Sequence, residues 1–117
     1  MPAYVFLCDN VTEAECLQRL LFGTNNHKTY DQSLKKITAG DWLFLYNYES
    51  GYLRGFYRAL TSCQKNIEPN AWSDSKTKYP YQVRVSDENE FAQPLSVNEL
   101  QGIINFSFSW KYPLPNS

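Results

Sequence analysis

The segment WLFLYNYESGYLRGFYRAL, residues 42–60, decides the fold. In an extended strand that begins at Trp42, alternate side chains point to opposite faces of the sheet. Both faces are apolar up to Asn47, so we expect this strand to be covered on both sides. Residues 49–51 supply a turn with a glycine, and the chain then returns as a second strand that Gly55 interrupts with a bend or bulge. The sequence therefore predicts a central hairpin in a small, strongly curved sheet.

The segments on either side of the hairpin predict short helices and further strands. Two of the helices are expected to begin with capping boxes, in which a hydroxyl and a glutamate three residues later cap each other's backbone. The expected elements are a strand at residues 4–8, a helix at 12–21 with Gly23 as its C-cap, a short helix at 30–37, a strand at 79–86, an acidic turn at 87–90, a helix at 96–104 and a final strand at 106–110. This order predicts an α+β fold with a barrel-like sheet.

Length and composition limit the classes of protein to consider. The 117 residues are enough for one domain, residues 1–117, and too few for two. The net charge is −1, so any binding of nucleic acid has to come from a local site and not from a basic surface overall. The three cysteines, without a CxxC pair, suggest reduced and buried thiols in a cytoplasmic protein. No signal peptide or membrane span is evident, and we expect no membrane partner.

Catalysis has little support in the sequence. His27 is the only histidine and lies in a polar segment, where a solvated surface residue is the ordinary interpretation. The glycine patterns of phosphate-binding and dinucleotide-binding loops are absent, as are the HxE and PCxxC motifs of zinc deaminases. We therefore expect a protein that is not an enzyme and has no metal and no cofactor.

Five short segments, taken together, resemble the plant DCD (development and cell death) domain. They are FLCDN (6–10), ECLQRLLFG (15–23), GDWLFLY (40–46), GFYRA (55–59) and YPYQVRV (79–85). Each is short, but their order and spacing are fairly specific. The chain departs from the family pattern in YPYQVR, which lacks the usual alanine, and in Gly23-Thr24, where leucine and proline often follow.

The same layout is similar, more distantly, to the EVE and YTH domains of the PUA-like superfold. This resemblance implies a curved β pseudo-barrel with flanking short helices. In YTH domains two aromatic rings sandwich a methylated base and an asparagine hydrogen-bonds it. The corresponding positions here are Phe22, Trp72 and Asn10, with the backbone of Gly23 and Thr24 beside them. The alternative is that Phe22 plugs the end of a helix and Trp72 caps the mouth of the barrel. We assign the other two tryptophans, Trp42 and Trp110, to the core.

Six basic residues are candidates for contacts with phosphate groups, although an ordinary solvated surface explains them equally well. They are Arg54, Arg58, Lys76, Lys78, Lys35 and Lys36. Stacking of an extruded base on an aromatic ring contributes about 1–3 kcal/mol. A buried methyl group adds only about 0.8 kcal/mol, roughly fourfold in affinity, so recognition of a modified base also needs polar contacts.

The leading hypothesis is therefore a reader module that binds DNA or RNA through a modified or flipped base. By analogy, such a module could be the recognition domain of a modification-dependent restriction system, with further domains in a longer chain. The alternative is a DCD-type protein–protein interaction adaptor without nucleic-acid binding. A small enzyme is the third class, and the sequence supports it least.

Overall fold

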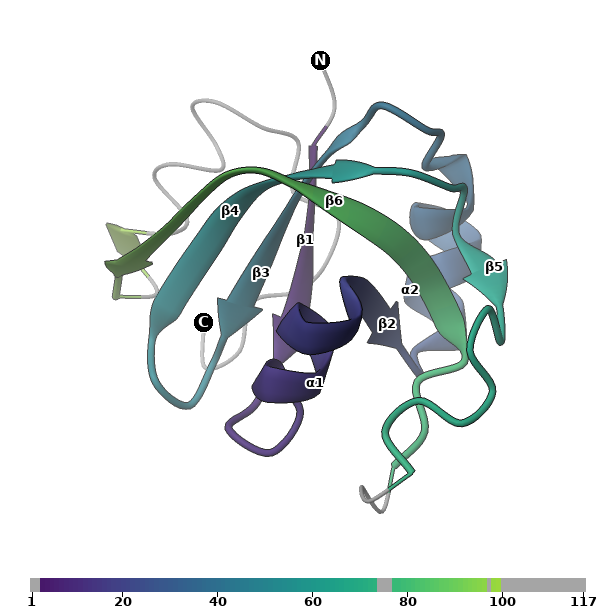
Figure 1. Cartoon of the computed structure of the whole chain (residues 1–117), viewed down its shortest axis with the longest axis horizontal. Coiled ribbons are helices and arrows are strands. Elements are labelled where there is room, and N and C mark those ends of the chain that lie inside the picture. Colours follow the sequence, from purple (N-terminus) through teal and green to yellow (C-terminus); the bar gives the residue numbers. More distant parts are fainter. Residues whose placement is uncertain (1–2, 74–76, 97, 100–117) are drawn as a thin grey trace.

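The computed structural model describes residues 3–73, 77–96 and 98–99. Short helices accompany a curled sheet, which gives an α+β half-barrel (Figure 1). The elements in chain order are β1 (Ala3–Cys8), α1 (Glu13–Arg19), β2 (Leu21–Thr24), α2 (His27–Gln32), the 3-10 turn η1 (Leu34–Lys36), β3 (Trp42–Asn47), β4 (Tyr52–Ala59), β5 (Gln64–Lys65) and β6 (Tyr81–Pro94). The predicted fold class is confirmed.

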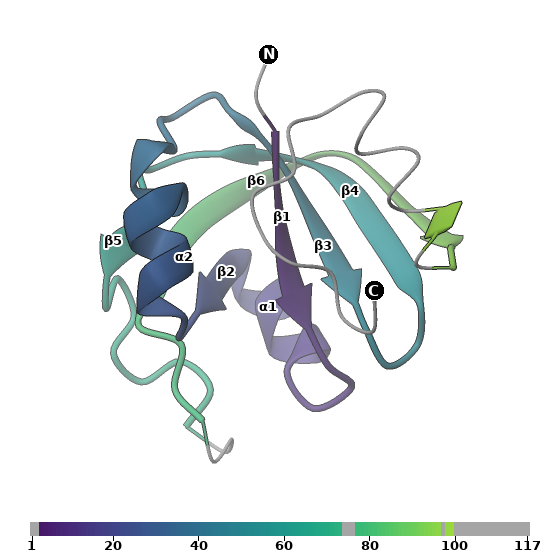
Figure 2. The ribbon, with the colours of Figure 1, turned by 180° about the vertical axis from the view of Figure 1, so that it is seen from behind.

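The strands follow the order β1-β3-β4-β6-β2, and β5 also pairs with β6. β1 and β3 run parallel, and the other pairs are antiparallel. The 14-residue strand β6 bends across the molecule, so its first part pairs with β2 and its later part with β4. β1 and β2 are the two ends of this order and come close to each other on the far side of the half-barrel (Figure 2).

The central hairpin matches its prediction. Leu43 and Leu45 enter the larger hydrophobic core, whereas Phe44 and Tyr46 enter a second, smaller one, so β3 is buried on both faces. The pairing of β4 with β6 shifts register just after Gly55, where the sequence predicted a bend or bulge. Both cores rest on this hairpin.

The first helix differs from its prediction at both ends. Thr12 does not cap the helix through its side chain, because its hydroxyl is hydrogen-bonded to the Asp9 carboxylate at 3.0 Å. The helix ends at Arg19, since Leu20 adopts a left-handed backbone with φ 51°. Gly23 is therefore not a C-cap. It lies within β2, which pairs with the start of β6.

Two other predicted elements are revised, and the C-terminal ones are described only in part. The helix expected at 30–37 begins earlier, as α2, and is followed by η1; the Asn26 side chain caps α2 by accepting from the Thr29 N–H at 3.0 Å. Residues 87–90 do not form a turn, because β6 continues through them beside β4. The Ser96 hydroxyl accepts from the Glu99 N–H at 3.1 Å, as a cap would. The rest of the predicted helix at 96–104 and the strand at 106–110, with Trp110 in the predicted core, lie outside the described residues.

All three cysteines are free and buried. Burial raises the pKa of the Cys16 and Cys63 thiols to about 12, so both stay protonated near neutral pH. In the part of the chain that the structure describes, no helix has the length and apolar character needed to span a bilayer.

Candidate functional site

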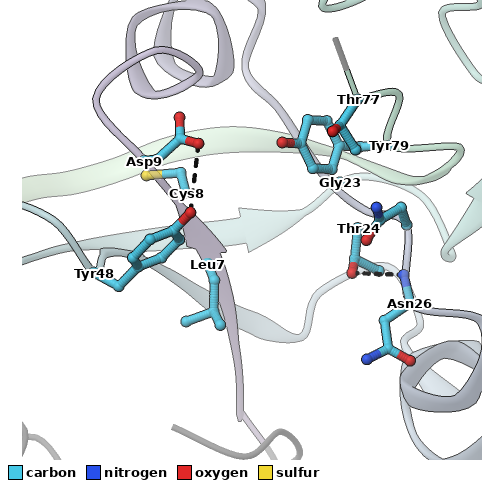
Figure 3. A pocket seen from close by; sticks show the side chains of 10 residues that line it. Leu7, Cys8, Asp9, Gly23, Thr24, Asn26, Tyr48, Thr77 and Tyr79 are labelled. Carbon is cyan, nitrogen blue, oxygen red and sulfur yellow. Dashed lines mark hydrogen bonds between the residues drawn. The ribbon is translucent and has the colours of Figure 1, made fainter. Parts of the chain in front are cut away.

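An open pocket of about 420 Å³ lies where β1 and β2 end side by side (Figure 3). Its volume falls within the range of about 300–1,000 Å³ that is typical of small-molecule sites. The lining residues come from four separate segments: Leu7, Cys8 and Asp9; Gly23, Thr24, Asn25 and Asn26; Tyr48; and Thr77 and Tyr79. The pocket therefore exists only once the sheet has curled and brought these strand ends together.

Two tyrosines supply the aromatic surface of this pocket. Figure 3 shows Tyr48 next to the end of β1 and Tyr79 on the side of Gly23, with open space between them. Burial raises the pKa of Tyr48, and the negative charge of Asp9, whose Oδ2 accepts from the phenol at 3.5 Å, raises it further. The Tyr48 phenol is thus neutral, and Asp9 fixes its direction.

The polar side chains of Thr24 and Asn26 lie on the β2 side of the pocket. Thr24 Oγ1 accepts from the Asn26 N–H at 3.1 Å, and Asn26 Oδ1 accepts from the Thr29 N–H at 3.0 Å. Because Oδ1 is used to cap α2, the other end of the Asn26 amide is the NH2 group, a hydrogen-bond donor. Figure 3 shows this nitrogen pointing away from the helix. A carbonyl or ring nitrogen of a ligand is the complementary partner.

Phe22 lies in the core and not in the pocket, contrary to the predicted sandwich. Its side chain is fully buried, and its ring meets Tyr57 edge-on at 5.0 Å and Phe6 at 6.0 Å between centroids. Phe22 belongs to the larger core cluster together with Tyr57 and Val83, its partner in the pairing of β2 with β6. The alternative interpretation of Phe22, as a core residue, fits this position.

Trp72 is also buried, with 1% of its surface exposed, and it packs behind Gly23. A Cβ added to Gly23 would lie 2.7 Å from Trp72 Cη2 and 3.0 Å from the carbonyl oxygen of Tyr79. The indole meets the Tyr79 ring edge-on at 5.2 Å. Trp72 thus supports the β2 side of the pocket from behind, and it does not face Phe22 across a cavity.

Asn10, the predicted hydrogen-bonding residue, is occupied elsewhere. Its side-chain oxygen accepts from Asn47 Nδ2 at 3.0 Å, and its backbone N–H donates to Glu49 at 2.8 Å. These bonds fasten the turn after β1 to the turn between β3 and β4. Among the predicted base-binding residues, only Gly23 and Thr24 line the pocket.

Comparison with known proteins decides the family. The chain matches the family model described as the development and cell death domain over residues 2–114. The chain belongs to the DCD family. It is 39% identical over 106 residues to the DCD domain-containing protein NRP-B of Glycine max, which covers 87% of this chain and 31% of that protein. It is 38% identical over 106 residues to the B2 protein of Daucus carota, covering 87% of this chain and 50% of that protein. The predicted resemblance to the DCD domain is confirmed.

This DCD domain therefore spans half or less of the curated relatives described above. Its fold is similar to that of the chain in the structure of a YTH domain-containing protein mmi1 and RNA complex, with a TM-score of 0.60. That match has 13% sequence identity and covers 96% of this chain and 71% of the other. At this identity the likeness shows the fold alone, and it confirms the expected similarity of this fold to that of YTH domains.

Three of the six predicted phosphate-binding residues of the DCD domain are engaged in ion pairs. Arg54 pairs with Glu13 at 3.0 Å. Arg58 pairs with Glu88 at 3.2 Å and lies 3.9 Å above the ring of Trp42, which is only half-buried and not deep in the core as expected. The remaining pair joins Lys35 to Asp31 at 3.1 Å. These contacts reduce the charge available for a ligand.

The other predicted lysines of the DCD domain differ from this group. Lys36 and Lys78 are exposed and make no ion pair within the described part of the chain. Lys76 lies outside the described residues. Sequence reasoning missed Tyr48, Tyr79 and Asn26, which line the pocket. The one available signal was that each of the three sits at the end of an element or beside a turn.

A carboxylate bridge holds the segment that contains Trp72 against the rest of the DCD domain. Glu68 accepts from Arg19 at 2.6 Å and from Arg84 at 2.6 Å, so it joins α1 to β6. Glu15, expected in a capping box, instead accepts from Arg19 at 2.8 Å and from the backbone N–H of Trp72. The two carboxylates hold Trp72 in place behind Gly23, and Trp72 in turn supports the β2 side of the pocket.

Replacing Glu68 by glutamine is expected to weaken the acid dependence of stability. Burial acts to raise the pKa of Glu68, but hydrogen bonds from Arg84 and Arg19 outweigh it and hold the pKa below its usual 4.5. A group with a lowered pKa stabilises the fold above its unfolded pKa, and this contribution is lost as the pH falls through the folded pKa. Urea unfolding from pH 6 to pH 3 should therefore show a shallower decline for Glu68→Gln than for the wild type.

The control for this experiment is Glu88→Gln, which removes the carboxylate of the more exposed pair with Arg58. Exposed pairs contribute little because solvent screens them, so this variant should follow the wild-type curve. Parallel curves for wild type and Glu68→Gln would contradict the assigned role of Glu68.

Proposed function

We propose that this DCD domain is a nucleic-acid-binding module in which the pocket between Tyr48 and Tyr79 accepts one unstacked base of a single-stranded RNA. The observation that carries the proposal is the pocket itself: two aromatic rings beside an open space, with a bare glycine backbone and oriented polar side chains at its edge. The fold supports the choice of RNA, because a similar structure is described as a complex of a YTH domain-containing protein with RNA.

The chemistry of the pocket suits a flat, polar guest. Base–aromatic stacking contributes about 1–3 kcal/mol per base and tolerates any base, because every base has a π-face. Trp72 fills the space where a side chain of Gly23 would lie, so Gly23 contributes only its backbone to the lining of the pocket. The Asn26 NH2 group and the Thr24 side chain provide polar contacts at the edge of the base. A methyl group on the base adds about 0.8 kcal/mol if it is buried, so a modified base is accepted with only a modest gain.

A protein-binding adaptor remains the competing function. The residues with large exposed apolar surface are Val11, Tyr48, Tyr52 and Leu60 among those described. Tyr48 contributes to the pocket, which gives it a role that a flat protein interface does not need. A role in a restriction system, which was expected by analogy alone, is not part of the proposal.

The test compares two exposed tyrosines on the same hairpin. Tyr48 is 43% exposed and lines the pocket, whereas Tyr52 is 39% exposed and lies outside the lining. Tyr48→Ala should weaken binding of an eight-nucleotide RNA of mixed sequence by about 5- to 150-fold, which corresponds to one lost stacking contact. Tyr52→Ala is the matched control and should bind like the wild type. Fluorescence anisotropy of labelled RNA measures both.

Two outcomes would refute the proposed function. One is a wild-type domain that does not bind the RNA at all, which would leave the adaptor as the better account. The other is an equal loss for Tyr48→Ala and Tyr52→Ala, because a general effect of the hairpin surface would then explain the result without a base in the pocket.

A further inference from the structure

Three aromatic rings form a cluster directly beside the pocket. His27 Nδ1 lies 2.7 Å from the hydroxyl oxygen of Tyr81, and the Tyr30 and Tyr81 rings stack with centroids 4.5 Å apart and planes 20° apart. Tyr81 pairs with Thr24 across the strands β2 and β6, and Asn26 directly precedes His27. We name His27, Tyr30 and Tyr81 the aromatic step, because they continue the pocket along the surface.

The aromatic step is rigid on its inner side and open on its outer side. Tyr30 and Tyr81 are half-buried and pack against the main core, whereas His27 is exposed on the first turn of α2. The hydrogen bond between His27 and Tyr81 holds the imidazole next to the two stacked rings. Rings that are already ordered lose little conformational entropy when a ligand stacks on them.

Away from the aromatic step, every basic side chain that the structure describes except Lys36 is ion-paired. Each of the four arginines is ion-paired to a carboxylate of the domain itself. Lys28, Lys65 and Lys78 are exposed and make no ion pair with the described residues.

Lys28 follows His27 in α2, Lys65 is the partner of Tyr81 in the pairing of β5 with β6, and Lys78 directly precedes Tyr79. The domain has a net charge of −1, so it is not basic overall, and each of these lysines neighbours a ring of the pocket or of the aromatic step. A chain of phosphates running past the aromatic rings is the ligand that complements both features.

We propose that the aromatic step and the three lysines form a track for single-stranded RNA that leads out of the pocket. This inference rests on the proposed function and deepens it: one base occupies the pocket, the neighbouring base stacks on the aromatic step, and the connecting phosphates meet Lys28, Lys65 and Lys78. The domain therefore reads a short run of unpaired nucleotides, and not an isolated base. A double helix does not fit this description, because its bases are already stacked on each other.

The track predicts separate effects on ligands of different length. His27→Ala should weaken binding of the eight-nucleotide RNA about fivefold or more, since it removes the exposed ring of the aromatic step. The same variant should leave binding of free adenosine unchanged, because a single nucleoside occupies the pocket alone. Tyr48→Ala should weaken both ligands. Chemical-shift titration by NMR measures the weak binding of adenosine.

The lysines predict a salt dependence. For single strands the slope of log K against log salt concentration is about −0.7 per neutralised phosphate, so three contacts give a slope of about −2. The triple variant Lys28→Gln, Lys65→Gln, Lys78→Gln should bring the slope for the eight-nucleotide RNA close to zero. Lys36→Gln is the control for removal of a positive charge away from the track, because Lys36 is exposed and unpaired among the described residues but lies on η1. This control should leave the slope unchanged.

Each result distinguishes the track from the pocket. If His27→Ala and the triple lysine variant bind the eight-nucleotide RNA as the wild type does, while Tyr48→Ala does not, the track is wrong and the pocket stands. If the wild type binds neither the RNA nor adenosine, both the pocket and the track are wrong. If a duplex of the same sequence binds as tightly as the single strand, the stacking assigned to the aromatic step is wrong.

Discussion

Trp72→Ala is expected to reduce the free energy of unfolding by about 3–5 kcal/mol, the usual cost of truncating a fully buried large aromatic side chain. The indole is 1% exposed, packs against Gly23 and Tyr79, and belongs to the main core. Its backbone has φ 57°, a left-handed conformation that is uncommon for a residue with a side chain. Packing of the indole and the hydrogen bond to Glu15 hold it there. Urea unfolding followed by circular dichroism measures the loss.

A double-mutant cycle with Gly23 isolates the contact. Gly23→Ala places a methyl group 2.7 Å from Trp72 Cη2, so we expect a loss of about 1–3 kcal/mol from overpacking. In the Trp72→Ala background the same methyl group enters vacated space and should cost much less. The double variant should therefore be more stable than the sum of the two single losses implies. Additive losses would show that Trp72 does not pack against Gly23 as described.

Asn47→Ala is expected to cost about 2–4 kcal/mol, because one fully buried amide makes three hydrogen bonds of about 1 kcal/mol each and its loss leaves partners unsatisfied. Nδ2 donates to Asn10 at 3.0 Å, and Oδ1 accepts from the N–H groups of Glu49 and Ser50 at 2.9 and 3.0 Å. These bonds join the end of β3 to two turns at once.

Asn10→Ala is the control for this prediction. It removes only one of the three side-chain bonds, from an exposed residue, and should cost no more than about 1 kcal/mol. Thermal and urea unfolding of both variants give the comparison. Equal losses would mean that the bonds to the backbone of the β3–β4 turn contribute nothing measurable.

The parts of the fold that the sequence predicted are those where local pattern and burial agree. β3 was predictable because its two faces are apolar and each meets its own core. The end of α1 was not predictable, because the apolar run Leu20–Phe22 can continue the buried face of a helix or form a short buried strand. Leu21 forms a strand because it pairs with Arg84, and this partner lies 63 residues further along the chain.

The prediction of a turn at the acidic segment 87–90 was wrong for a related reason. Its charges favour a solvated turn locally, yet Asp87 pairs with Tyr57 as β6 continues beside β4.

The predicted aromatic sandwich differs from the structure for another reason. Phe22 and Trp72 were chosen by their place in the family resemblance, and both rings are in the core. Tyr48 and Tyr79 belong to different strand ends, and only the curl of the sheet brings them to one pocket. Composition and spacing carry no information on that meeting.

Because β2 pairs only with β6 among the described strands, the folding of the domain depends on contacts between distant parts of the chain. Partners in this pair are about sixty residues apart, and β1 joins β3 across roughly forty, so few stabilising contacts are local. Such topologies reach the native state slowly, in milliseconds to seconds. During synthesis, β2 has no strand to pair with, and β4 lacks its second neighbour, until β6 emerges from the ribosome.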